Sequence, residues 1–140
     1  MIHYAAILKK LEELKKKYNI KEIAFDRWGA TKLSQDLTGA GFKMVEFGQG
    51  YASMSAPTKE LLTLILSKRI RHGGNPVLRW MADCMEVKQD PAGNIKPAKP
   101  DRGRSGKRID GIVALVMAID LITRNQKKPS VYETRGVLFV

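Results

Sequence analysis

Apolar residues recur at helical spacing near both ends of the chain. Between residues 108 and 122 one face is formed by Ile109, Ile112, Val113, Val116 and Ile119. The remaining positions of this stretch are also mostly apolar, and a helix that is apolar nearly all round is typically buried. Residues 2–17 carry a narrower stripe, with lysines and glutamates on the rest of the surface. The pattern predicts a buried helix near the end of the chain and an amphipathic helix at its start.

The segment between these helices has the order strand, helix, strand. Residues 20–26 contain three consecutive apolar positions, which is typical of a central strand. Residues 30–38 predict a short helix closed by glycines, and residues 42–47 predict a second strand. This order predicts a parallel βαβ unit with a right-handed crossover.

Two capping signals mark further helices in the middle of the chain. Ser55 as N-cap, with Pro57 in the first turn, predicts a helix that runs to about Leu66. Asn75 and Pro76 predict the start of another helix in the same way. Residues 70–72, shortly before that cap, predict a short extended segment.

A hairpin and a basic loop precede the buried helix. The segment 86–97 predicts a β-hairpin with its turn at residues 90–94. Residues 96–108 are rich in Pro and Gly and hold six basic residues against one acid, so we expect a mobile loop. We expect residues 1–125 to form one packed domain. Residues 126–140 are then a tail, whose apolar end could pair as an edge strand or dock onto a partner.

The charge balance adds a class of partner to this outline. Lys and Arg total 25 against 14 Asp and Glu, which gives a net charge of +11 on 140 residues. This surplus indicates a polyanionic partner, most simply nucleic acid, with an anionic membrane surface as the weaker alternative.

Several classes of protein are excluded or disfavoured. A single cysteine permits no internal disulfide and no cysteine-rich zinc site. The longest apolar run, residues 112–119, is too short to span a bilayer, and no secretory signal is visible at the start. We therefore expect a cytoplasmic protein without a membrane partner. No phosphate-binding loop of the ATPase type occurs.

Two aspartates are the candidates for chemistry. Asp26 ends a predicted strand, and ligands of open α/β sheets bind at that edge. Asp110 lies in the first turn of the buried helix, where an acid stabilises a helix by about 0.3–1 kcal/mol. Each alone is explained by local structure, Asp26 as a turn residue. Together with the basic surplus, they indicate a metal-dependent phosphodiester hydrolase, whose divalent ions need at least two carboxylates.

Other polar and aromatic side chains carry weaker signals. His72, next to a glycine pair, fits a phosphate contact or an ordinary surface residue equally well. Trp28 and Tyr51 could stack on bases, although Trp28 could as readily cover the core. Trp80 is expected in the core.

Several consecutive motifs resemble the C-terminal part of tailed-phage terminase large subunits. They occur in the same order as in that family and span roughly residues 1–123. The motifs are Phe25-Asp-Arg-Trp-Gly-Ala30, Phe47-Gly-Gln-Gly-Tyr51, Met54-Ser-Ala-Pro-Thr-Lys-Glu60, His72-Gly-Gly-Asn-Pro76, Leu78-Arg-Trp-Met81, Asp90-Pro-Ala-Gly-Asn-Ile-Lys-Pro97 and Ile109-Asp-Gly-Ile-Val-Ala-Leu115.

The resemblance implies a fold and an activity. It implies an α/β, partial ribonuclease-H-like fold: a short, mostly parallel sheet flanked by helices, plus a basic β-hairpin and loop. It implies part of an endonuclease that cuts concatemeric DNA in the bacterial host cell. Asp26 and Asp110 would be catalytic residues that bind Mg²⁺ or Mn²⁺. The family's first metal-binding acid lies on an earlier strand that this chain does not contain, so an incomplete site and an isolated chain of uncertain activity are expected.

The resemblance also implies partners. These are double-stranded DNA, the terminase ATPase domain, the small terminase subunit and the portal. We expect the DNA backbone to be guided by a set of basic side chains: Arg27, His72, Lys99, Arg102, Arg104, Lys107 and Arg108.

Two alternatives remain at this point. One is a non-catalytic DNA-binding or assembly fragment that needs a partner chain to bring the missing strands. The other is a ribonuclease-H-like resolvase unrelated to packaging.

Overall fold

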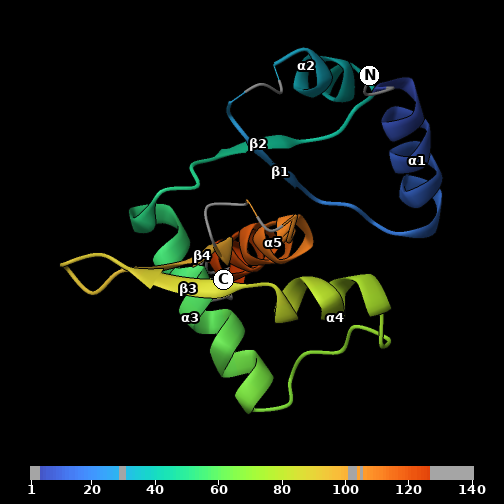
Figure 1. The fold of residues 1–140 in the computed structure, drawn as a ribbon. Coiled ribbons are helices and arrows are strands. Elements are labelled where there is room, and N and C mark those ends of the chain that lie inside the picture. The colour runs from blue at the N-terminus through green and yellow to red at the C-terminus, as the bar shows by residue number, and fades with distance from the viewer. Residues whose placement is uncertain (1–3, 29–30, 101–103, 105, 127–140) are drawn as a thin grey trace, which may run out of the picture.

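The structure, a computed structural model, describes residues 4–28, 31–100, 104 and 106–126 (Figure 1). Its elements in chain order are α1 (Tyr4–Lys17), β1 (Ile23–Asp26), α2 (Thr31–Gly39), β2 (Met44–Phe47), α3 (Tyr51–Leu66), α4 (Pro76–Asp83), β3 (Glu86–Gln89), β4 (Ile95–Ala98) and α5 (Asp110–Gln126). The predicted tail beyond Gln126 lies outside the described residues.

Helix α5 is the element against which the others pack. It contacts α3, α4 and β1, and α3 in turn contacts β4 (Figure 1). The core between α5, α3 and the end of β2 is formed by Phe47, Met54, Leu61, Ile112, Val116, Met117 and Ile119. Val116 is fully buried, which confirms the prediction that the apolar pattern of this helix supplies the core. None of the described helices is long and apolar enough to cross a membrane.

One face of α5 departs from the prediction of burial all round. Ala114, Ala118 and Ile122 lie one helical turn apart and are exposed, Ile122 by 56%. They line a shallow groove of about 390 Å³ together with Ile23 and Ala24 of β1. Burial of this face was predicted from apolar character alone, but in the described residues no further element covers it.

The parallel βαβ unit is confirmed. Strands β1 and β2 pair in parallel with Ile23 opposite Met44 and Asp26 opposite Phe47, and α2 lies between them in the chain. The prediction that β1 is a central strand is wrong for the described residues, because its sheet contains only β1 and β2. The three apolar residues of β1 are half-buried, since α5 and not a second flanking strand accounts for their burial.

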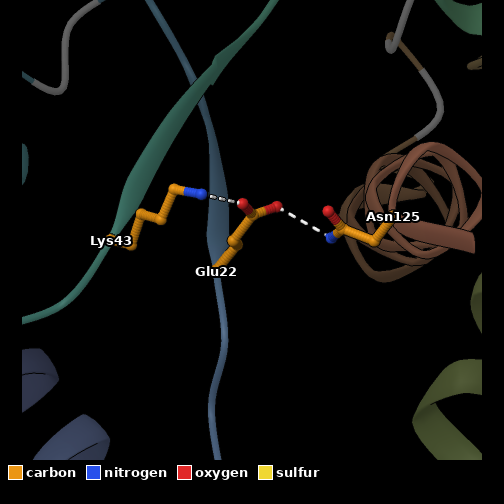
Figure 2. A network of polar contacts seen from close by, with 3 residues as sticks. All are labelled: Glu22, Lys43 and Asn125. Carbon is orange, nitrogen blue, oxygen red and sulfur yellow. Dashed lines mark hydrogen bonds and ion pairs between the residues drawn. The ribbon is translucent and has the colours of Figure 1, made fainter. Parts of the chain in front are cut away.

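A polar network fixes the start of β1 against the end of α5 (Figure 2). Glu22 forms an ion pair with the ammonium of Lys43, which precedes β2. The second carboxylate oxygen of Glu22 accepts a hydrogen bond from Asn125 Nδ2 at 3.0 Å. The Glu22 side chain is only 12% exposed, so these charge-assisted contacts are stronger than those of an open surface pair. One carboxylate therefore links two strands and the closing helix.

The N-terminal helix is confirmed, but it packs loosely. No residue of α1 is buried, and Tyr18, at the end of its apolar stripe, is 55% exposed. Its attachment is partly polar: Lys15 Nζ donates to the carbonyl of Ala40 at 3.2 Å and lies 4.8 Å from the centre of the Phe42 ring.

Helix α3 begins earlier than predicted. Its N-cap is Gly50, so Ser55 and Pro57 lie inside the helix and both are buried. Ser55 is no cap because its hydroxyl faces β4, where it accepts a hydrogen bond from the backbone N–H of Ile95 at 3.2 Å. The predicted start followed a local capping rule, and a contact forty residues away overrides it.

Of the remaining predictions for helix α4 and the tryptophans, one is confirmed and the others are not. Asn75 caps α4 as predicted, since its side-chain oxygen accepts from Leu78 N–H at 3.0 Å. The extended piece expected just before this cap forms no strand. The two tryptophans are not core residues: Trp80 is 47% exposed and Trp28 is 77% exposed. Trp80 was expected in the core, and Trp28 was expected either to stack on bases or to cover the core. Neither helix α4 nor the end of β1 is covered on that side by described residues.

Candidate metal and nucleic-acid site

Asp26 is held at the carboxyl end of β1. The strand ends there because the chain turns sharply, and Asp26 Oδ1 accepts a hydrogen bond from the backbone N–H of Trp28 at 3.2 Å. This is the turn-forming bond expected of an aspartate after a strand. No described residue bonds to its other oxygen, so the turn role does not exclude a second role in binding.

Asp110 is the first residue of α5 and its only acid in the first turn. The preceding residue, Ile109, is 3% exposed, and its carbonyl accepts from the N–H groups of Ile112 and Val113. This buried anchor fixes the helix start, so the Asp110 carboxylate stands on the surface with 70% exposure. Lys99 Nζ lies 3.6 Å from its Oδ1.

The two aspartates line the same cleft. This cleft has a volume of about 660 Å³ and lies between the end of β1, the start of α5, the loop before α3 and the β3–β4 hairpin. Asp26 and Asp110, far apart in the sequence, are its only carboxylates among the described residues. The structure therefore brings both aspartates to one cleft, while their metal-binding role stays a prediction.

The hairpin contributes lysines that the sequence analysis missed. Lys88 and Lys96 lie opposite each other in the β3–β4 register and both line the aspartate cleft, as does Lys99. Lys96 Nζ lies 4.8 Å from the centre of the Tyr51 ring, which holds its charge at the mouth of the cleft. Opposite residues of a ladder share a face, so the observed register brings both lysines to the cleft.

The turn of the hairpin is set by one carboxylate, and the hairpin prediction is confirmed. Asp90 accepts hydrogen bonds from the backbone N–H of Asn94 at 2.8 Å and from its side-chain Nδ2 at 2.9 Å. The side-chain bond from Asn94 is the main reason why the pKa of Asp90 lies below its usual value. This rigid turn positions the cleft lysines.

The donor set suits a hard divalent cation, but it is small. Mg²⁺ and Mn²⁺ prefer carboxylate and amide oxygens, and the cleft offers two carboxylates and the amide of Gln49. Among the described residues no group of three or more His, Cys, Asp or Glu side chains could hold a metal ion. The residues thus fit a divalent ion with few protein ligands and several waters.

The predicted DNA-guiding residues fall into three groups. Lys99 lines the cleft, and Arg104, Lys107 and Arg108 are exposed in the segment leading to Asp110. Arg27 is exposed beside the cleft, with its guanidinium 5.4 Å from the centre of the Trp28 ring.

His72 is not brought to the cleft. His72 lines a separate, mainly apolar groove between α3, α4 and α5. Arg102 lies outside the described residues.

Comparisons with known proteins agree with this geometry. Residues 1–126 match the sequence profile of the terminase large subunit, endonuclease domain. The chain is 34% identical over 120 residues to the terminase large subunit of Enterobacteria phage HK97, and 37% identical over 118 residues to protein YmfN of Escherichia coli K12. Each alignment covers 84% of this chain and only 23% or 26% of the relative, so the chain spans about a quarter of their length.

A solved structure is similar as well. The crystal structure of the HK97 bacteriophage large terminase matches with a TM-score of 0.75 at 34% identity, over 86% of this chain and 25% of that one. The match supports the partial ribonuclease-H-like α/β fold expected from the sequence.

Proposed function

This chain belongs to the terminase large subunit endonuclease domain family, and from this premise we propose that it is part of a divalent-metal-dependent DNA endonuclease. In this proposal Asp26 and Asp110 are the metal-binding catalytic carboxylates, and the chain takes part in cutting concatemeric DNA during phage genome packaging. The observation that carries the proposal is the single cleft into which the end of β1 and the start of α5 bring both carboxylates.

In this proposal the acidic residues of the cleft bind the metal ion and the basic residues bind DNA. Asp26 and Asp110 would hold Mg²⁺ or Mn²⁺, which when bound supplies an activated water and charge stabilisation of the leaving oxygen. Lys88, Lys96 and Lys99 face the same cleft and would hold the phosphate backbone of DNA against the carboxylates. The basic segment before α5 would extend this contact along the duplex, consistent with the net charge of +11.

The larger assembly is part of the proposal. Because the chain spans about a quarter of its relatives, we expect the remaining functions of a large terminase subunit to lie in other segments. The partners would be double-stranded DNA, the terminase ATPase domain, the small terminase subunit and the portal. The place of action would be the cytoplasm of the bacterial host.

Plasmid nicking tests the catalytic proposal. Supercoiled plasmid is incubated with the pure chain and Mn²⁺ or Mg²⁺, and nicked product is followed with time. We expect nicking that is lost in Asp26→Asn and in Asp110→Asn. Asp36→Asn is the matched control, since Asp36 is exposed on α2 and does not line the cleft. Equal activity of all three variants would disprove the proposed site.

A second candidate function rests on the outer edge of β1. In a parallel ladder alternate residues bond to the same neighbour, and Ile23 N–H bonds to Lys43, so the main-chain groups of Ala24 face the other edge. That edge adjoins the groove lined by Ala118 and Ile122. A chain that needs a partner polypeptide to add a strand there would bind DNA and not cut it alone. Nicking that appears only after addition of the preceding segment of a relative would favour this candidate.

A further inference from the structure

Gln49 lies where the two strands and the closing helix converge. It follows the end of β2 by two residues, and the last residue of β2, Phe47, is paired with Asp26. Gln49 is therefore at the same edge of the sheet as the Asp26 carboxylate. It is exposed and lines the cleft that holds both aspartates.

The orientation of its amide is fixed by a contact with α5. Gln49 Nε2 donates to Met117 Sδ at 3.8 Å, and Met117 is 5% exposed. A thioether sulfur accepts and cannot donate, so the NH₂ group must face it. The carbonyl oxygen of the same planar amide consequently points away from Met117. Among the described residues it has no hydrogen-bond donor.

The amide of Gln49 contacts the face of α5 on which Asp110 also lies. Met117 lies seven residues after Asp110, which is two helical turns along the same face of α5. Val113 and Ala114, between them on that face, also line the cleft. The Gln49 amide therefore bridges from the end of β2 to the helix face whose first residue is Asp110.

We propose that Gln49 Oε1 is a third oxygen donor for the divalent ion held by Asp26 and Asp110. This inference rests on the proposed function. Amide carbonyls are ordinary ligands of hard divalent ions, and a neutral donor adds a bond without adding charge. With two carboxylates in the described cleft, a third oxygen raises the number of protein ligands while several waters complete the shell. The contact with Met117 orients the amide before the ion arrives.

Mn²⁺ binding to the pure full chain tests the assignment. Free Mn²⁺ is measured by electron paramagnetic resonance during titration of the chain at low ionic strength. We expect Gln49→Leu to weaken binding several-fold. We expect Gln49→Glu to strengthen it several-fold, because the added negative charge attracts the cation. The matched control is Gln35→Leu on α2, an exposed glutamine outside the cleft, which should bind as the unmodified chain does.

A second readout observes the amide directly. In ¹H–¹⁵N spectra, Mg²⁺ should shift the side-chain NH₂ signals of Gln49 and leave those of Gln35 unchanged. Thermal unfolding of each variant verifies that the fold persists. If Gln49→Leu does not fold, the Gln49→Glu titration and the Mg²⁺ shift decide the question.

The outcomes separate this inference from the function on which it rests. Loss of Mn²⁺ binding in Asp26→Asn, with Gln49→Leu unaffected, overturns the Gln49 assignment and leaves the proposed site intact. Weaker DNA binding in Gln49→Leu at unchanged Mn²⁺ affinity overturns it too, in favour of a DNA contact. Absence of Mn²⁺ uptake by the unmodified chain also overturns it, whereas the endonuclease proposal is decided separately by plasmid nicking.

Discussion

Replacement of Lys99 by Met should raise the affinity of the cleft for divalent ions and lower its affinity for DNA. Lys99 Nζ lies 3.6 Å from Asp110 Oδ1. The ammonium therefore forms an ion pair with the carboxylate that is proposed to bind the metal ion. Methionine keeps the apolar stem and removes the charge. The change releases the Asp110 carboxylate and removes a repulsive positive charge beside the ion, so divalent-ion affinity should rise. It also removes a cation that would contact DNA, so DNA affinity should fall.

The size of both effects follows from exposure. At this separation two unit charges attract by about 1 kcal/mol in water. Asp110 is 70% and Lys99 35% exposed, so solvent screening limits the pair to roughly 0.2–1 kcal/mol. Release of the carboxylate alone should therefore tighten Mn²⁺ binding between about 1.4-fold and fivefold. Loss of one phosphate contact should reduce the slope of log affinity for duplex DNA against log salt by about 0.9.

Two titrations measure these quantities. Mn²⁺ affinity is obtained by electron paramagnetic resonance, and affinity for a fluorescent duplex by anisotropy at several salt concentrations. Lys88→Met is the matched control for the first measurement, because Lys88 lines the cleft and has no ion pair with a described carboxylate. Weaker Mn²⁺ binding in Lys99→Met would refute the reasoning, since the ammonium would then support the ion and not compete with it.

Three further predictions concern the framework of the cleft. The pKa of Asp90, measured by NMR, should lie below 3.8 and should rise in Asn94→Ala; since the pKa is lowered in the folded state, the hairpin gains stability above the ordinary carboxyl pKa and loses it as the pH falls through the lowered value. Met54→Ala should lower the free energy of unfolding by about 2–5 kcal/mol in urea titration, because Met54 is 2% exposed at the centre of the core. Ser55→Ala should cost about 1–3 kcal/mol in the same assay, because the N–H of Ile95 loses its acceptor, and a cost near zero would show that water replaces the hydroxyl.

Local rules predicted the elements that local contacts determine. Asn75 caps α4 through a bond three residues away, and Asp90 closes the hairpin turn through bonds four residues away. Helix α5 was predicted from its apolar period, and Asp110 lies in its first turn as expected. For the cap and the hairpin turn the stabilising partner lies within a few residues, so the sequence pattern contains it.

Features that depend on distant neighbours were not predictable in this way. The start of α3 was misplaced because Ser55 bonds to Ile95, which no capping rule can anticipate. Trp80 was expected in the core but is exposed, because burial depends on what covers a side chain and not on the side chain alone. The sequence near a tryptophan does not show which distant elements pack over its side chain.

The candidate site shows the same division. Asp26 was identified by its place at a strand end and Asp110 by its place in the first turn of a buried helix; the structure brings both to one cleft. The facing lysines of the hairpin were overlooked, because the hairpin was predicted without the register that pairs them. Gln49 had no chemical signal in the sequence, because its orientation depends on Met117, which reaches it only through the packing of α5.

The length of helix α5 sets the distance between its two ends. Its last turn is tied to the start of β1 by the bond between Asn125 and Glu22, while its first residue, Asp110, lines the same cleft as Asp26 at the far end of that strand. One inserted residue between the two ends would rotate them relative to each other by about 100° and lengthen the helix by about 1.5 Å. Insertions and deletions should therefore be eliminated from α5.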